Sequence, residues 1–388
     1  MAFFASGISG LDEDTIGYIF NLLAITGHIG REGCGVNPIT GLNNLQGGFD
    51  MGCAPDLLTG FQPLSNSDAV QKFNQAWGVS LNTAPGRSVY DLLDSAPGPL
   101  KALVAVDHDE GIIRSAEAIK QLEFVVYIGS YQNRFMDYAH AVLPVASYIE
   151  EDGTFTNTDR RVQLSKKKRE PQPGILPGWK LLTRMAQQVG APWNYAGPAD
   201  VMDEIARLTP PYARISHTLL ESALGGIQWP CNEKHPRGTP HFDLAHNGGT
   251  INFAPVSGKF DLPAASADFP YLLMIGKAQD FWHQNNLMRK TFIPMREYNA
   301  TLLDYPDGYI EIAPETARLL QVRNQWQVKV VSPYGELLLA VKISEDIKPN
   351  AAYAPYFAKE KIIHRLVGPQ ELLPQGEDAT VPIRIEKV

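Results

Sequence analysis

The chain has few cysteines, no long apolar run and no excess of basic charge, and each absence excludes a class of protein. None of its three cysteines, Cys34, Cys53 and Cys231, lies in a Cys-x-x-Cys pair, so we expect no zinc site and no iron–sulfur cluster bound by this chain alone. Such sparse cysteines are typical of a reducing compartment. No stretch approaches the roughly 18 apolar residues of a membrane helix, and the net charge of −8 argues against a general nucleic-acid binder.

The first residues also lack a basic region and have too short an apolar core for a signal peptide. We therefore expect a cytoplasmic protein, or one that is exported together with a partner. At 388 residues the chain is long enough for two or three domains. Changes in composition and apolar periodicity predict an α/β region over residues 1–225, a linker over 226–268 and a β-barrel over 269–388.

Residues 41–48 form the most distinctive stretch, because three amide side chains and three glycines fall within it. The amides of Asn43, Asn44 and Gln46 each carry one acceptor and two donors. Glycines such as Gly47 let the backbone approach a flat ligand closely. The stretch therefore suits the edge of a pterin or a guanine. An ordinary polar turn is the alternative, since Gly and Asn also favour turns.

Short apolar runs at residues 100–106, 124–128 and 141–146 are interleaved with a helical segment at 112–122. Strand–helix–strand with continuous apolar strands predicts a parallel, doubly wound sheet covered on both faces. Ligands of such sheets bind beyond the carboxyl ends of the strands, so residues 107–111 and 129–133 are candidate binding loops, unless they are plain turns. Further helices are predicted near residues 67–76, 179–189 and 201–208.

After residue 267 the sequence becomes rich in strand formers. Strands are expected at residues 271–275, 309–312, 327–332, 336–344, 353–357 and 381–388, with a helical turn at 314–320. They predict a small, mostly antiparallel barrel. His235 and His241 lie in the linker without a carboxylate or cysteine at ligand spacing, so a metal site is not expected there.

Taken in order, these segments resemble the C-terminal half of the molybdopterin-dependent oxidoreductases, most closely the catalytic (alpha) subunits of formate dehydrogenases. The matching segments are Asn43-Asn44-Leu45-Gln46-Gly47, Asp50-Met51-Gly52, Leu143-Pro144 and Gly226-Ile227-Gln228-Trp229-Pro230-Cys231, together with residues 23–30, 33–38, 152–157 and 160–163. The resemblance covers essentially the whole chain. It implies a partial doubly wound parallel-sheet domain of the molybdopterin oxidoreductase type, followed by a double-psi-like, dinucleotide-binding β-barrel.

The resemblance also implies a cofactor, molybdopterin guanine dinucleotide with molybdenum or tungsten, usually bound as a pair (bis-MGD). The implied contacts are Asn43, Asn44, Gln46 and Gly47 at one pterin, Ser130, Asn133 and Asn157 near a guanine–ribose end, and Gly276, Lys277, His283, Asn285 and Asn286 at the other dinucleotide. Lys277 would face a diphosphate, since cations bind phosphates well. No catalytic residue and no metal ligand is expected in this chain.

In the family, the N-terminal half carries the [4Fe–4S] cysteines, the metal-ligating Cys or selenocysteine and a catalytic His. We therefore expect a partner subunit with the cluster, further electron-transfer subunits, and a split enzyme that oxidises formate or reduces CO₂. Residues 133–135, 285–288 and His364 depart from the family pattern at cofactor-facing positions. These departures leave open a cofactor-poor structural subunit of a larger electron-transfer complex. A free-standing cofactor carrier or insertion chaperone is the third reading.

Overall fold

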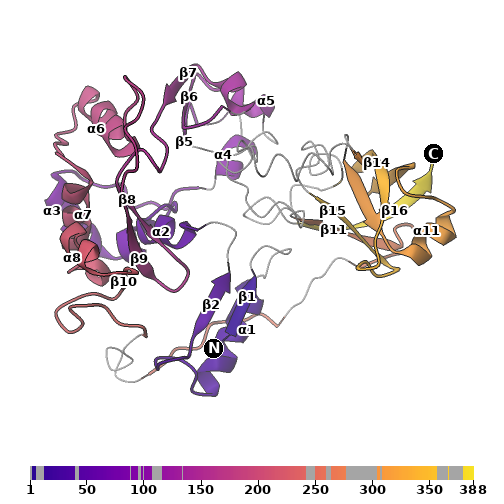
Figure 1. Ribbon diagram of the computed structural model, residues 1–388, viewed down its shortest axis with the longest axis horizontal. Coiled ribbons are helices and arrows are strands. Elements are labelled where there is room, and N and C mark those ends of the chain that lie inside the picture. The colour runs from indigo at the N-terminus through magenta and orange to yellow at the C-terminus, as the bar shows by residue number, and fades with distance from the viewer. Residues whose placement is uncertain are drawn as a thin grey trace. The chain divides into compact units, whose positions relative to one another are not determined.

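The computed structural model divides the chain into two compact units (Figure 1). The first unit comprises Met1–Phe3, Leu23–His108 and Ser115–Ile251, and the second, the barrel unit, comprises Phe4–Leu22, Asp109–Arg114 and Asn252–Val388. The residues that the structure describes are 2–5, 13–39, 43–87, 89–94, 98, 100–106, 116–132, 134–241, 250–258, 264–276, 304–305, 308–355, 366 and 379–388. No helix in this described part is long and apolar enough to cross a membrane.

The first unit contains the predicted parallel sheet. Its strands are β5 (Ala102–Val106), β6 (Phe124–Gly129) and β7 (Ala141–Pro144), paired in parallel in that order. Residues 125–129 of the central strand β6 are buried, as expected for a strand covered on both faces. Of the helix expected at 112–122 the structure describes α5 (Ala116–Ile119), and the candidate loop 107–111 lies outside the described residues.

A second, antiparallel sheet in this unit joins β8 (Gly153–Thr156), β9 (Arg161–Ser165) and β10 (Ile227–Gln228). The helices α6 (Gly178–Gln188), α7 (Pro198–Leu208), the 3-10 turn η4 (Pro210–Tyr212) and α8 (His217–Ser222) lie between β9 and β10 in the chain. Val162, Tyr212, Trp229 and Cys231 share one buried cluster. Part of the segment expected as a linker is thus packed core, and the division between the units falls at residue 251.

The remaining elements before β5 are short. They are β1 (Ala2–Ala5), α1 (Glu13–Ile25), β2 (Val36–Ile39), α2 (Leu45–Asp50), β3 (Leu57–Leu58), η1 (Thr59–Phe61), β4 (Gln62–Pro63), α3 (Ser67–Trp77) and α4 (Val89–Asp94). The predicted helix α3 begins where the Asn66 side chain accepts hydrogen bonds from the backbone N–H groups of Asp68 and Ala69, and it ends at the left-handed Gly78. Between β6 and β7 lies η3 (Arg134–Tyr138).

The barrel unit contains a closed six-stranded barrel with strand order β11-β15-β12-β14-β13-β16. Its elements are β11 (Tyr271–Gly276), β12 (Tyr309–Ile312), α11 (Pro314–Leu320), β13 (Gln327–Ser332), β14 (Gly335–Ile343), β15 (Ala351–Pro355) and β16 (Ala379–Lys387). β11 and β15, and likewise β12 and β14, pair in parallel, and the other neighbours are antiparallel. The mostly antiparallel barrel predicted from the sequence is confirmed.

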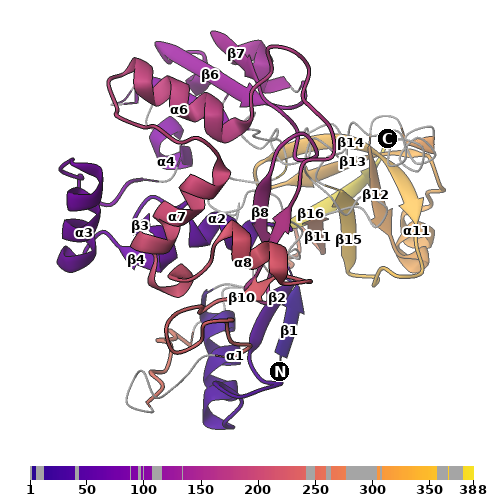
Figure 2. The ribbon, with the colours of Figure 1, turned by 60° about the vertical axis from the view of Figure 1, so that its left-hand side comes forward.

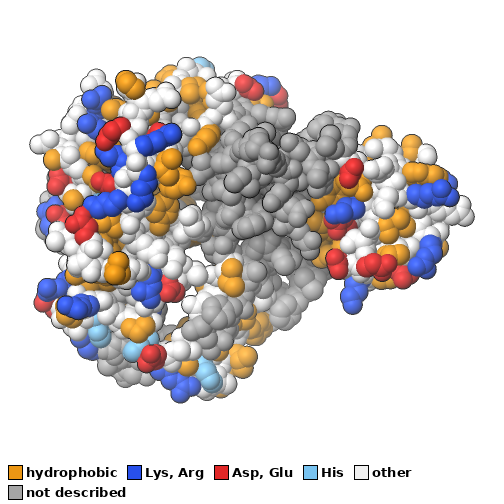
Figure 3. Space-filling model, viewed as in Figure 1, with side chains coloured by type: hydrophobic (Ala, Val, Ile, Leu, Met, Phe, Trp, Pro, Cys, Tyr) orange, Lys and Arg blue, Asp and Glu red, His pale blue; other side chains and the backbone are white. Residues whose placement is uncertain are grey.

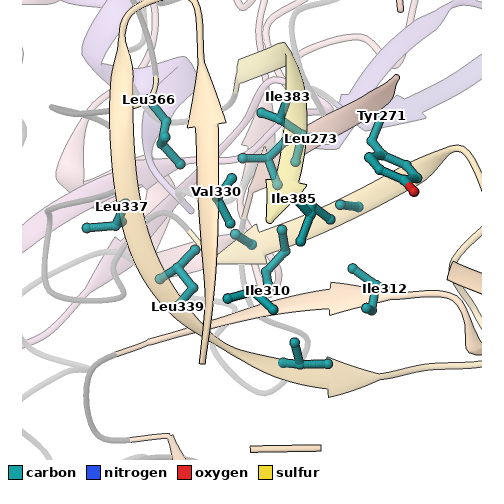
Figure 4. Close-up of a cluster of buried hydrophobic side chains, with 14 of the residues drawn as sticks. Tyr271, Leu273, Ile310, Ile312, Val330, Leu337, Leu339, Leu366, Ile383 and Ile385 are labelled. Carbon is teal, nitrogen blue, oxygen red and sulfur yellow. The ribbon is translucent and has the colours of Figure 1, made fainter. Parts of the chain in front are cut away.

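The barrel is filled with apolar side chains that alternate along its strands (Figure 4). Leu273, Ile310, Val330 and Ile383 are fully buried there. Because every strand of a closed barrel has two neighbours, no strand edge is left unpaired. The same unit includes the first turns of α1, where the Asn21 side chain exchanges two hydrogen bonds with the Ala254 backbone, at 3.0 and 2.8 Å.

Candidate functional site

The amide-rich stretch forms a turn at residues 43–44 and then begins the short helix α2, so only its first part is the loop expected from the sequence. Gly47 is buried inside this helix. A Cβ atom built on Gly47 would lie 2.2 Å from Asn44 Oδ1, whereas one built on Gly48 would meet nothing within 4 Å. A larger residue at position 47 would therefore displace the Asn44 side chain.

Asn44 connects this stretch to β8, which lies beside α2 (Figure 2). The backbone N–H of Thr156 donates a 2.8 Å hydrogen bond to Asn44 Oδ1. Two segments predicted to contact the cofactor, around Asn44 and around Asn157, are thus brought together across 112 positions of sequence. Among the described residues the Asn44 amide nitrogen and the exposed Asn43 side chain have no hydrogen-bond partner, so donors remain available to a ligand.

At the other end of α2, the buried carboxylate of Asp50 links α2 to η4 and to the segment after β10. Asp50 is 1% exposed. Its Oδ2 accepts hydrogen bonds from the Tyr212 hydroxyl and, at 2.8 Å, from Trp229 Nε1, and its Oδ1 accepts from Gln46 Nε2 at 2.8 Å. Burial raises the pKa of Asp50 above its ordinary value, although these three hydrogen bonds act in the opposite direction.

The Asp50 network includes Gln46, which is predicted to line a pterin. Its amide nitrogen donates to Asp50, one turn later in α2, so this donor is satisfied within the helix. Burial, more than the nearby Asp50 charge, also raises the pKa of the Tyr212 hydroxyl, which therefore stays a hydrogen-bond donor. Sequence reasoning missed Tyr212. Asp50 and Trp229 were present in the matching motifs, but nothing in the sequence indicated that they touch.

Asn157 begins the tight turn between β8 and β9. Its Oδ1 accepts a 2.9 Å hydrogen bond from the backbone N–H of Arg161, and its carbonyl accepts one from Arg160 at 2.9 Å. Arg160 adopts a left-handed conformation with φ of 66°. Its guanidinium donates to the carbonyls of Trp229 and Pro240. Asn157 thus has a structural role in the turn whether or not it also contacts a ligand.

The same turn contains an acceptor that sequence reasoning overlooked. Asp159 Oδ1 is buried and has no hydrogen-bond partner among the described residues, while Oδ2 accepts from Gln228 Nε2 at 3.2 Å. An unsatisfied buried acceptor costs free energy, so such an atom in a native protein calls for a missing donor. In the sequence, the one indication of this acceptor was that Asp159 lies two residues after Asn157, a predicted cofactor contact.

Of the other predicted contacts, the structure describes Ser130 and Gly276. Ser130 is half-buried just after β6, at the carboxyl end of the parallel sheet. Gly276 ends β11, opposite Pro355 of β15. Asn133, Lys277, His283, Asn285, Asn286 and the departures at 285–288 and His364 lie outside the described residues. Within the described ranges, no group of three His, Cys, Asp or Glu side chains could hold a metal ion.

Two family models match the chain: molybdopterin oxidoreductase over residues 11–188, and molydopterin dinucleotide binding domain over residues 290–377. A curated relative, the F420-dependent formate dehydrogenase subunit alpha of Methanocaldococcus jannaschii, is 33% identical over 354 residues, which are 88% of this chain and 51% of that protein. Among solved structures, acetylene hydratase from Pelobacter acetylenicus matches with a TM-score of 0.54 over 83% of this chain and 50% of that one.

The structural match has 13% sequence identity and therefore shows a shared fold alone. The relative from M. jannaschii shows more, because the match extends over most of this chain, although the chain spans only about half of that protein's length. The two family models lie in the order that the fold presents, an α/β region followed by the barrel. The chain belongs to the molybdopterin oxidoreductase family.

Proposed function

We propose that this chain binds a pterin–guanine dinucleotide in a molybdenum- or tungsten-dependent formate dehydrogenase, which oxidises formate or reduces CO₂. The observation that carries the proposal is the Asn44 side chain, held by Thr156 on one side and fitted against Gly47 on the other. This arrangement fixes the amide oxygen internally and leaves the amide nitrogen for the edge of a flat heterocycle. The name of the M. jannaschii relative supports formate as the substrate.

The described residues fit such a cofactor in two places. A pterin edge offers acceptors for the amide nitrogens of Asn43 and Asn44, and a guanine edge offers N–H donors for the orphaned Asp159 Oδ1. When bound, the metal centre would supply the two-electron chemistry. This chain would bind and orient the organic part of the cofactor, and none of its residues is proposed as a catalytic acid, base or metal ligand.

A partner chain would supply the [4Fe–4S] cluster and the Cys or selenocysteine at the metal, with further electron-transfer subunits beyond it. The edge strand β5 supports a covering partner, because its Val104 and Val106 are 49% and 56% exposed, whereas parallel sheets are normally covered on both faces. We place the assembly in the cytoplasm, where the three cysteines, which are free, would stay reduced.

A matched pair of glycine variants tests the proposal in the natively purified assembly. Gly47→Ala displaces Asn44, so cofactor affinity should fall about tenfold, or about 1.4 kcal/mol of binding free energy, and pterin and metal content should fall with it. Gly48→Ala places its methyl group in open space and should leave both contents unchanged. Metal analysis by mass spectrometry, pterin fluorescence after oxidation and formate-dependent dye reduction provide the readouts.

The alternative function is a structural subunit that keeps the fold without the cofactor. It is favoured by one observation, the Gln46–Asp50 hydrogen bond, because this amide is satisfied internally and needs no ligand. A native wild-type assembly with iron but without molybdenum, tungsten or pterin would establish this alternative. It would also overturn the cofactor-binding role, whatever the glycine variants show.

A further inference from the structure

A pocket of about 490 Å³ opens on the surface of the barrel unit, at the end of α11. Three basic side chains line it, Arg318, Arg323 and Lys387, and no acidic side chain does. They surround the half-exposed ring of Trp326 together with apolar residues of α11 and β14. In a chain with a net charge of −8, this is a local concentration of positive charge.

The surface of the barrel unit carries charges of both signs (Figure 3). Several of its other cations are paired with acidic side chains, whereas within the described part of the chain the pocket cations are not. Lys329 lies 3.0 Å from Glu386, Lys342 lies 2.7 Å from Glu311, and Arg384 lies 2.6 Å from Glu386. Arg318, Arg323 and Lys387 have no ion pair among the described residues. The barrel therefore neutralises cations elsewhere on its surface and leaves these three uncompensated.

The backbone around the pocket is well defined. Helix α11 is followed by its C-cap residue Gln321, which is left-handed with φ of 55°. The N–H groups of Gln321 and Val322 bond the carbonyls of Arg318 and Ala317, at 3.1 and 3.0 Å. These N–H groups satisfy two of the last four carbonyls of the helix, so the three cations have to outweigh what remains of the negative end of α11.

Trp326 organises two of the cations. The guanidinium carbon of Arg323 lies 5.9 Å from the centre of the Trp326 ring, and Lys387 Nζ lies 5.5 Å from the same ring. Cation–π contacts at these distances hold the side chains without neutralising them. The charges are thus positioned before any ligand arrives, which lowers the entropic cost of binding.

The pocket lies at the opposite end of the barrel from the segment predicted to touch the dinucleotide. Ile275, at the end of β11, pairs with Ala379 at the start of β16, whereas Lys387 at the far end of β16 pairs with Val328. The eight steps between Ala379 and Lys387 correspond to roughly 26 Å of extended strand. One bound dinucleotide phosphate near Gly276 would therefore leave this pocket vacant.

We propose that this pocket binds a phosphate-bearing small molecule, separately from the pterin cofactor. Two guanidinium groups suit the oxygens of a phosphate, which they bind in a bidentate manner, and a lysine adds a third positive charge. The volume falls within the usual range of small-molecule sites. The proposal does not depend on formate dehydrogenase activity, because it uses no residue of the Asn44 site.

The test titrates the full, natively purified chain with pyrophosphate and follows binding by calorimetry and by tryptophan fluorescence. The wild-type protein should bind with a dissociation constant below about 1 mM. Arg323→Gln and Lys387→Gln should each weaken binding about tenfold, since each removes a direct charge-assisted contact. Trp326→Phe should abolish the fluorescence change, which assigns the signal to this one of the six tryptophans.

Lys342→Gln is the matched control, because it removes one positive charge from the same barrel at a site already paired with Glu311. It should change pyrophosphate affinity less than about twofold, as expected for a charge that is already paired and does not line the pocket. Equal losses in Lys342→Gln and Lys387→Gln would show diffuse electrostatic attraction and overturn the proposal. So would the absence of saturable pyrophosphate binding by the wild-type chain.

Discussion

The barrel core and the centre of the Asp50 network are both buried, but they are stabilised in different ways. In the barrel, residues such as Leu273 and Val330 belong to a cluster of buried apolar side chains (Figure 4). In the first unit, the buried carboxylate of Asp50 accepts hydrogen bonds from Tyr212, Trp229 and Gln46. Burial of apolar area stabilises without direction, whereas hydrogen bonds to a buried charge fix the positions of their donors.

This difference explains how each region serves the rest of the molecule. The barrel needs only apolar volume inside, so its surface is free to carry sites such as the basic pocket. The Asp50 network instead fixes α2 against η4 and the segment after β10, and α2 in turn presents Asn44. Positional accuracy at the candidate cofactor site therefore depends on a buried polar group.

The largest expected effect comes from removing apolar volume in the barrel. Leu273→Ala should reduce the free energy of unfolding of the barrel by about 3 kcal/mol, because the side chain is fully buried and would leave a cavity. Leu338→Ala, at a 52% exposed position on β14, should cost less than about 0.5 kcal/mol. Denaturant unfolding with hydrogen exchange of barrel amides measures both, and equal costs would contradict a tightly packed core.

A comparable or somewhat smaller effect should follow from removing the acceptor in the first unit. Asp50→Leu removes the acceptor shared by the donors of Tyr212, Trp229 and Gln46, which should cost about 2–3 kcal/mol. Asp50→Asn should cost only about 1 kcal/mol, since its amide oxygen still accepts from two donors and Gln46 can rotate to accept from its amide nitrogen.

Denaturant unfolding compares the two Asp50 variants with each other and with the wild type. If Asp50→Leu is as stable as Asp50→Asn, apolar packing rather than hydrogen bonding holds this centre together, and the contrast with the barrel disappears. Pterin content provides a second readout, because a displaced α2 would also move Asn44.

The barrel could be predicted from the sequence to within a few residues at most strand ends, because alternation of apolar residues is a local signal. Its strand order could not, since β11 pairs with β15 and β16 across gaps of about 80 to 110 positions. A local rule also explains why α7 starts three residues earlier than predicted, at Pro198, because proline suits the first turn of a helix.

At the candidate site, too, contacts between residues far apart in the chain could not be predicted from the sequence. The amide and glycine content pointed to residues 43–47, but the acceptor that braces Gln46 comes from Asp50, and the donors to Asp50 come from Tyr212 and Trp229, which lie 162 and 179 positions away. No periodicity encodes such contacts. Residues 226–268 were predicted to be a linker because they are rich in proline, glycine and histidine, yet they contribute the buried Trp229 and Cys231 to the core.

The smallest expected effect is the pH dependence of the Asp50 centre. Burial raises the pKa of Asp50 from its ordinary value of 3.8, so the folded state keeps this proton to a higher pH than the unfolded state does. Its contribution to stability is therefore fully present below pH 3.8 and is lost as the pH rises through the folded-state pKa. As the pH rises from 3.8 to the folded-state pKa of Asp50, the wild-type protein should lose stability relative to Asp50→Asn. Above that pKa the difference in free energy of unfolding between the two proteins should stay constant.

Measuring the difference between the two proteins cancels the titration of the other carboxylates, as long as those lie far from Asp50. The groups that face Asp50 are the donors of Tyr212, Gln46 and Trp229, together with the positive charge of Arg160, and all four favour the ionised form. A gain of wild-type stability over the same pH range would mean that these donors outweigh burial. The centre would then be a site prepared for a charge, and its contrast with the apolar barrel would be larger than the structure indicates.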